Sequence, residues 1–147
     1  MSDKLSIETA LERDGVILHS VTGRSMLPLL RPDRDAAEIS KISGDISVGD
    51  VVLFKAADRY ILHRVVDMHG ESFTARGDHN YFSERGITRR QIVGVMAAAI
   101  RNGRRVDVTS RGYRRYVRFW CAIFPLRAPM LYASAKIRAA AAKLLRR

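Results

Sequence analysis

Residues 51–66 read VVLFKAADRYILHRVV, and this stretch decides the fold. Two apolar runs, one on each side, flank the turn dipeptide Ala57-Asp58. Short runs of β-branched and aromatic residues on either side of a turn are typical of paired β-strands. Because side chains alternate along a strand, we expect Ile61, His63 and Val65 to share one face of the second strand.

Outward from this pair, turn residues such as Gly49-Asp50 and Gly77-Asp78 divide the first two thirds of the chain into further short apolar runs. The predicted strands are residues 16–21, 51–55, 60–66, 73–76 and 92–100. Before them, helical spacing of apolar residues predicts a short helix over residues 5–13, with Gly15 as its stop. Regularly spaced short strands indicate a compact, mainly β domain.

After Val108 the period becomes helical. A first apolar stripe consists of Tyr113, Tyr116, Val117, Trp120 and Phe124, and a second of Met130, Ala133, Ile137, Ala140 and Leu144. Pro125 and Pro129 are expected to interrupt the run, which predicts a basic amphipathic hairpin or pair of helices. Residues 119–135 are too short, and too broken by prolines and an arginine, to predict a membrane span.

The charge is divided unevenly between these two regions. The chain of 147 residues carries a net charge of +11. Residues 101–147 contain 13 Lys and Arg but one acidic residue, Asp107, so they carry +12 and the remainder −1. Any attraction to polyanions or anionic lipid therefore belongs to the C-terminal tail. No nucleic-acid recognition motif accompanies this basicity, so we do not expect a nucleic-acid partner.

Cysteine content and the first residues narrow the class of protein further. The single cysteine, Cys121, excludes an intrachain disulfide and a cysteine metal cluster. Residues 1–13 contain no apolar run, which argues against a signal peptide or membrane anchor there. We expect a cytoplasmic protein or one peripheral to a membrane.

A candidate nucleophile lies in the turn GRSMLP, residues 23–28, where Ser25 stands between a flexible glycine and a rigid proline. Serine is common in turns, so a structural role is the simplest interpretation of Ser25 taken alone. A neutral serine needs a neighbouring base before it attacks a carbonyl. His69 and His79 stand beside turn glycines and are expected to be solvated, and His19 fits an ordinary strand position.

His63 is the better candidate for the base because it is expected among aliphatic side chains on a strand face. A structural role is the alternative. The polar segment GDHNYFSERG, residues 77–86, contains Asp78 and Glu84. Either carboxylate is able to accept the far N–H of an imidazole and stabilise the imidazolium.

Five motifs occur in an order that resembles the signal peptidase I family of serine peptidases. They are Gly-Arg-Ser-Met-Leu-Pro at 23–28, Gly49-Asp50, His-Arg-Val-Val at 63–66, Gly-Asp-His-Asn at 77–80 and Glu-Arg-Gly at 84–86. The resemblance covers about residues 16–97. A histidine in place of the usual bacterial lysine is similar to the endoplasmic-reticulum-type and spore-former branch.

The resemblance implies roles for individual residues. Ser25 corresponds to the nucleophile and His63 to the general base, while Glu84 and Asp78 are both candidates for orienting the base. The family's oxyanion hole uses the N–H of the nucleophile and, in some members, a hydroxyl two residues earlier. Gly23 stands at that position, so a second donor here is a backbone N–H or is absent. Losing one such donor typically costs about 10²–10³ in rate.

Met26 and Pro28 correspond to residues near the family's substrate-binding surface. For Met26 the alternative is ordinary core packing. The resemblance involves no metal and no cofactor.

The fold expected from the resemblance is a signal-peptidase or SOS-repressor-like β domain over residues 1–108, followed by a helical extension over residues 109–147. The expected function is a serine endopeptidase that cleaves an extended peptide or leader segment, with a peptide or protein as its partner. The basic tail either contacts an anionic membrane surface or packs on the β domain.

Two alternative functions remain. One is a non-catalytic membrane-surface or nucleic-acid binding protein on the same scaffold. The other is a self-cleaving peptidase of the SOS-repressor type, which the absence of a lysine base and of a DNA-binding domain before the serine disfavours. The sequence leaves the oligomeric state open.

Overall fold

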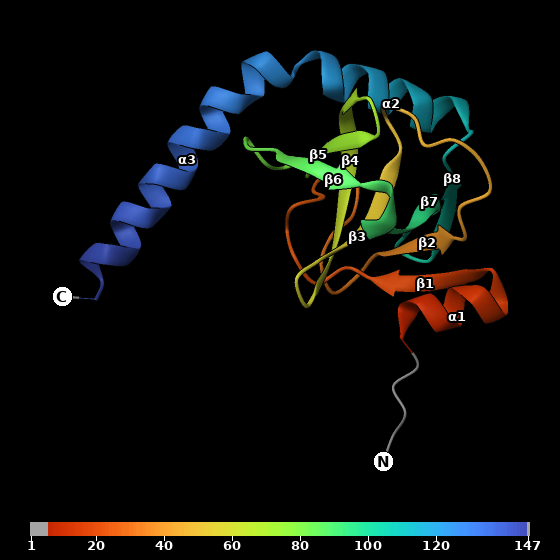
Figure 1. The fold of residues 1–147 in the computed structure, drawn as a ribbon. Helices are drawn as coiled ribbons and strands as arrows, with labels where there is room; N and C mark the ends of the chain where they lie inside the picture. Colours follow the sequence, from red (N-terminus) through yellow and green to blue (C-terminus); the bar gives the residue numbers. More distant parts are fainter. Residues whose placement is uncertain (1–5, 147) are drawn as a thin grey trace.

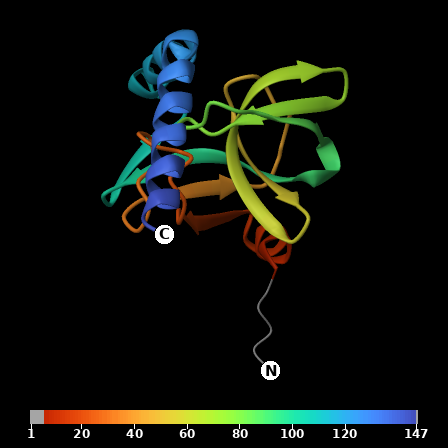
Figure 2. The same ribbon diagram turned by 90° about the vertical axis from the view of Figure 1, so that its left-hand side faces the viewer.

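The computed structural model describes residues 6–146, which form one antiparallel sheet of eight strands with a helix before it and two helices after it (Figures 1 and 2). The strands are β1 (Val16–Ser20), β2 (Ala36–Ser40), β3 (Val51–Ala56), β4 (Arg59–His69), β5 (Ser72–Arg76), β6 (Glu84–Thr88), β7 (Ile92–Arg101) and β8 (Arg104–Asp107). Their spatial order is β1-β2-β7-β3-β4-β5-β6, and β8 pairs with β7. The mainly β prediction is confirmed.

The strand pair β3 and β4 lies at the centre of the sheet. β3 pairs with β4 so that Val52 is opposite His63. Val51 and Leu53 belong to one hydrophobic core, and Val52 and Phe54 belong to a second core on the other face. Burial on both faces explains why this strand is continuously apolar rather than alternating. Each such side chain contributes roughly 1.5–3 kcal/mol through burial.

All five predicted strands are present, and three further strands were not predicted. β2 (AAEIS), β6 (ERGIT) and β8 (RRVD) contain alanine, glycine and charged residues of weak strand propensity. β2 exists because it is hydrogen-bonded on both sides, to β1 and to β7. Pairing with segments more distant in the sequence therefore decides β2 and β6, whereas β8 returns from β7 through the tight turn at Asn102-Gly103.

The N-terminal helix α1 (Ile7–Asp14) begins where Ser6 accepts a hydrogen bond from the Thr9 N–H. It ends at Gly15, whose φ of 75° is left-handed, so the predicted stop is confirmed. The first two residues of the predicted range lie outside or at the edge of the described residues. Leu11 is buried in the first core and attaches the helix beside β1 (Figure 1).

The C-terminal region forms helices α2 (Arg111–Ala122) and α3 (Phe124–Leu144). The expected break is present at Ile123, and Pro125 lies in the first turn of α3, where its missing N–H costs nothing. The expected interruption at Pro129 is wrong, because the helix continues through it with the loss of one backbone hydrogen bond. Neither of these helices, nor α1, is long and apolar enough to span a membrane.

α2 lies across one end of the sheet (Figure 1), where its tyrosines contact a buried ion pair between β4 and the segment after β5. Arg64 on β4 donates to both carboxylate oxygens of Asp78, from Nε at 2.8 Å and from Nη2 at 2.7 Å. Tyr113 accepts a hydrogen bond from Arg64 at 3.1 Å, and Tyr116 donates one to Asp78 at 2.8 Å. Burial, with the adjacent Asp78 charge, raises the pKa of Tyr116.

We expect Asp78→Asn to destabilise the protein by about 3–5 kcal/mol, because the buried Arg64 charge loses its counter-charge. Urea unfolding measures the change. Asp45→Asn is the matched control, since Asp45 is exposed and forms no ion pair within residues 6–146. Equal stability of the two variants would contradict a central role for the ion pair.

Candidate active site

Ser25 lies in a loop between β1 and β2 that is anchored on both sides. Met26, Leu29 and Leu30 are buried in the first core immediately after it. The Asp35 carboxylate accepts hydrogen bonds from the backbone N–H groups of Arg31 and Asn102, which closes the loop against the end of β7. Ser25 is therefore held in place by its neighbours.

The Ser25 side chain is half-buried, and its Oγ forms no hydrogen bond within residues 6–146. Its backbone carbonyl accepts a hydrogen bond from the His79 N–H at 2.8 Å. This contact joins the serine loop to the segment that follows β5.

Gly77 is the point of closest approach between the two segments. A Cβ built on Gly77 would lie 2.6 Å from the Ser25 carbonyl oxygen and 2.9 Å from the Ser25 Cβ. Any side chain there would collide with backbone, so the glycine is required by space.

The register of the sheet brings His63 to the same place. β4 and β5 are antiparallel and pair Arg64 with Arg76. The residue after Arg76, which is Gly77, therefore comes alongside the residue before Arg64, which is His63. Gly77 thus touches Ser25 and continues the strand that pairs with β4, the strand that carries His63.

His63 is 5 % exposed and projects into the second core, as the alternation of Ile61, His63 and Val65 predicts. Its ring lies edge-on to Phe54, with the ring centroids 6.2 Å apart. Nδ1 lies 2.5 Å from Oε2 of Glu84, the first residue of β6. In the neutral tautomer with its proton on Nδ1, this contact leaves Nε2 with a lone pair.

Glu84 and Asp78, the two acids between which the sequence does not distinguish, have different partners. Both Asp78 oxygens accept hydrogen bonds from Arg64, and one also accepts from Tyr116. The structure thus pairs His63 with Glu84 and Asp78 with Arg64, and Asp78 holds the fold beside the site. The sequence feature that points to this role of Asp78 is Arg64 in the His-Arg-Val-Val motif, a charged residue within an otherwise apolar strand.

The other residues drawn from the resemblance are distributed around the loop. Gly23 is exposed, with open space around it. Pro28 is exposed and follows a cis peptide bond. Met26 is 1 % exposed within the first core, so packing, the alternative for this residue, accounts for it.

The remaining histidines differ in environment. His69 is exposed and paired with Asp67 at 2.8 Å, as expected of a solvated residue. His79 is half-buried beside Ser25, so the expectation of a solvated His79 is wrong. Burial, with the charges of Arg24 and Arg138, lowers the pKa of His79. His19 on β1 is half-buried, and burial lowers its pKa.

A cavity of about 350 Å³ opens at Ser25, and we call it the Ser25 pocket. Residues of the serine loop, of the segment after β5 and of α3 line it: Arg24, Ser25, His79, Asn80, Tyr81, Phe82, Leu131, Ala135 and Arg138. The sequence gives no signal for the three α3 residues, because their place depends on how the helix crosses the domain.

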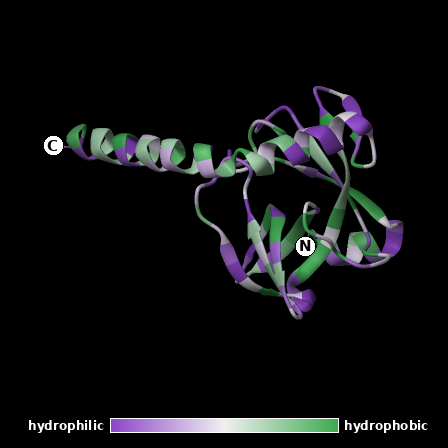
Figure 3. Cartoon of the chain, turned by 90° about the horizontal axis from the view of Figure 1, so that it is seen from above, coloured by the Kyte–Doolittle hydropathy of each residue, from purple (hydrophilic) through white to green (hydrophobic). Residues whose placement is uncertain are grey.

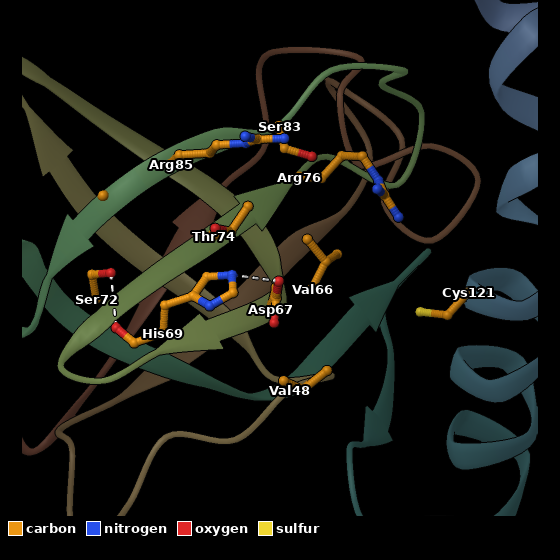
Figure 4. A pocket seen from close by; sticks show the side chains of 11 residues that line it. Val48, Val66, Asp67, His69, Ser72, Thr74, Arg76, Ser83, Arg85 and Cys121 are labelled. Carbon is orange, nitrogen blue, oxygen red and sulfur yellow. Dashed lines mark hydrogen bonds and ion pairs between the residues drawn. The ribbon is translucent and has the colours of Figure 1, made fainter.

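A larger cavity of about 590 Å³ lies elsewhere, between the outer face of β4, β5 and β6 and Cys121 of α2 (Figure 4). Ser72, Thr74 and Arg76 of β5 project into it, but Ser25, His63 and Glu84 do not line it. His63 and Glu84 do not line the Ser25 pocket either, but Ser25 itself does, so the Ser25 pocket is the candidate site.

Within residues 6–146, no group of three or more His, Cys, Asp or Glu side chains is placed to hold a metal ion. No protein-family model matches the chain, and neither a curated protein nor a solved structure shows significant similarity to it.

We expect Gly77→Ala to destabilise the protein by about 1–3 kcal/mol, because the added methyl group overlaps the Ser25 backbone. Urea unfolding measures the effect. Gly44→Ala is the control, since a Cβ on Gly44 meets nothing within 4 Å. If Gly77→Ala were as stable as Gly44→Ala, the close approach of the two segments would be wrong.

Proposed function

We propose that this chain is a serine endopeptidase of the signal peptidase type, with Ser25 as nucleophile, His63 as general base and Glu84 as the residue that orients His63. The observation that carries the proposal is the contact of 2.5 Å between His63 Nδ1 and Glu84 Oε2. His63 lies on the strand that pairs with β5, whose following residue Gly77 approaches Ser25. A serine, an imidazole and a carboxylate in this order form the arrangement that activates a hydroxyl for acyl transfer.

In the proposed reaction, His63 Nε2 takes the proton of Ser25 Oγ as the oxygen attacks the peptide carbonyl. The Glu84 carboxylate stabilises the resulting imidazolium. His63 then gives the proton to the leaving amine, and the C–N bond breaks to leave an acyl-enzyme. Water, deprotonated by His63, hydrolyses the ester and regenerates Ser25.

The backbone supports an oxyanion hole with a single identified donor. The Ser25 N–H makes no hydrogen bond to another group within residues 6–146 and is available to the developing oxyanion. Gly23 has no hydroxyl to add. Pro28 is an exposed residue of the loop, and we propose that it contacts the substrate beyond the pocket.

We further propose that the fold is the signal-peptidase-like β domain, covering residues 1–108. The first part of the extension of residues 109–147 packs into this domain, because Tyr113 of α2 is buried in the same core as Val51 and Leu53. The peptide or protein substrate is the expected partner.

We expect Ser25→Ala and His63→Ala each to lower peptide hydrolysis by about 10⁴-fold or more, because the two groups act as a unit. Glu84→Gln is expected to lower it by about 10⁴-fold at most, since the base remains but loses its orienting carboxylate. Mass spectrometry of a digested peptide pool measures hydrolysis, and a fluorophosphonate probe reports the reactive serine.

Ser43→Ala, His69→Ala and Glu71→Gln are matched controls at exposed positions away from the site. They are expected to retain full activity and full labelling. Unchanged turnover by folded Ser25→Ala protein would overturn the proposed mechanism.

A second candidate function is binding to an anionic membrane surface through α3. The second apolar stripe is open to solvent instead of packed on the sheet, with Met130, Ile137 and Leu144 each about 70 % exposed or more. α3 extends away from the sheet with this apolar surface uncovered (Figures 1 and 3). No acidic residue follows Asp107, so nothing in the helix opposes an anionic surface.

We expect the chain to float with vesicles rich in phosphatidylserine, and Met130→Ser/Ile137→Ser to weaken that binding by about tenfold or more through lost burial. Ala139→Ser/Ala142→Ser, on another face of α3, is the control and is expected to bind normally. Equal flotation of both double variants would show that the stripe does not contact lipid. Binding to nucleic acid that both variants retain would favour the polyanion alternative.

A further inference from the structure

Two of the three parts of the chain that line the Ser25 pocket are separated in the sequence by about a hundred residues. Arg24 and Ser25 belong to the loop after β1, whereas Leu131, Ala135 and Arg138 belong to α3. These three positions, together with Arg127, recur every three or four residues and so share one face of the helix. The face of α3 that lines the pocket therefore lies on the opposite side of the helix from part of its exposed apolar stripe.

Two contacts hold this wall against the segment that follows β5. Arg127 Nη1 donates to the backbone carbonyl of Asp78 at 2.9 Å. Tyr132 packs edge-on against Tyr81, with ring centroids 5.3 Å apart and planes at 88°. Since Asp78 is itself bound to Arg64, this part of α3 is attached to the interior of the domain.

The pocket carries positive charge without a balancing anion. Arg24 and Arg138 both line it, and no acidic side chain does. Neither arginine forms an ion pair with any group in residues 6–146, whereas Arg34, Arg64 and Arg105 all do. The nearby Asp78 carboxylate is occupied by Arg64 and Tyr116.

Burial lowers the pKa of His79, and the positive charges of Arg24 and Arg138 lower it further. The lowered pKa favours the neutral imidazole, which is able to donate one hydrogen bond and accept one. Tyr81 and Phe82 are partly exposed and offer an apolar surface beside the two charges. Positive charge next to aromatic surface suits a carboxylate on an aliphatic stem.

We propose that the Ser25 pocket binds a carboxylate of the substrate peptide, within a few residues of the bond that is cut, through Arg24 and Arg138. This inference rests on the proposed peptidase function and adds the class of substrate. The carboxylate is that of an aspartate or glutamate side chain, or that of the peptide's C-terminus. Arg24 and Arg138 act as specificity residues, and Ser25 and His63 carry the chemistry.

The test uses the full chain with Ser25→Ala, so that binding is measured without cleavage. A displayed library of random peptides is selected on this protein, and the frequency of Asp and Glu is compared with that of Asn and Gln. We expect several-fold enrichment of the acids, which disappears when Arg24→Gln/Arg138→Gln is added. Each exposed charge pair accounts for up to about fivefold.

Arg59→Gln/Arg89→Gln removes the same charge at exposed positions outside the pocket and is expected to leave the enrichment unchanged. An equal loss with this control would overturn the inference in favour of non-specific attraction to a basic protein. Absence of acidic enrichment in the Ser25→Ala protein would also overturn it.

An enriched peptide, synthesised with Glu→Gln or with an amidated C-terminus, distinguishes the two sources of the carboxylate by fluorescence anisotropy. Lost affinity in one arm identifies the source, and unchanged affinity in both overturns the inference. Failure of the proposed function has a different signature, because it removes Ser25-dependent hydrolysis but leaves this binding selectivity intact.

Discussion

The buried ion pair between Arg64 and Asp78 is the interaction on which the rest of the structure depends. Arg64 is 1 % exposed and Asp78 4 %, so both charges have left water. Such a transfer is costly unless the geometry is good and further hydrogen bonds satisfy the remaining groups. Here the contact is bidentate, and the Gly49 carbonyl and two tyrosine hydroxyls complete it. The pair joins β4, the segment after β5 and α2 at one point.

The candidate site lies directly beside this pair in the chain. His63 precedes Arg64 on β4, and Gly77 precedes Asp78, so the ion pair holds the base and the contact point of the serine loop at a common position. Only Glu84 arrives independently, from the first residue of β6 at the edge of the sheet. A site supported in this way keeps its geometry through rigid interior contacts, which is what positioning of a nucleophile and base requires.

The C-terminal helices divide two tasks between them. α2 contributes Tyr113, Tyr116 and Trp120 to the interior, with the Trp120 indole donating to the Asp78 carbonyl at 2.8 Å. α3 is attached near its beginning and then turns one face to the Ser25 pocket while its apolar stripe stays open. One helix thus connects a candidate substrate pocket to a surface suited to lipid, so a membrane-bound chain would present its pocket close to the bilayer.

The sequence by itself determined the parts of the protein that depend on neighbours along the chain. The central strands follow from their apolar runs, the end of α1 from Gly15, and the face of His63 from strand alternation. Tertiary structure alone decided β2 and β6, the pairing of His63 with Glu84 instead of Asp78, and the approach of Arg138 to Ser25. The physical reason is range. Periodicity and turn residues report contacts within a few residues, whereas strand pairing and ion pairs between distant segments depend on which surfaces the folded chain brings together.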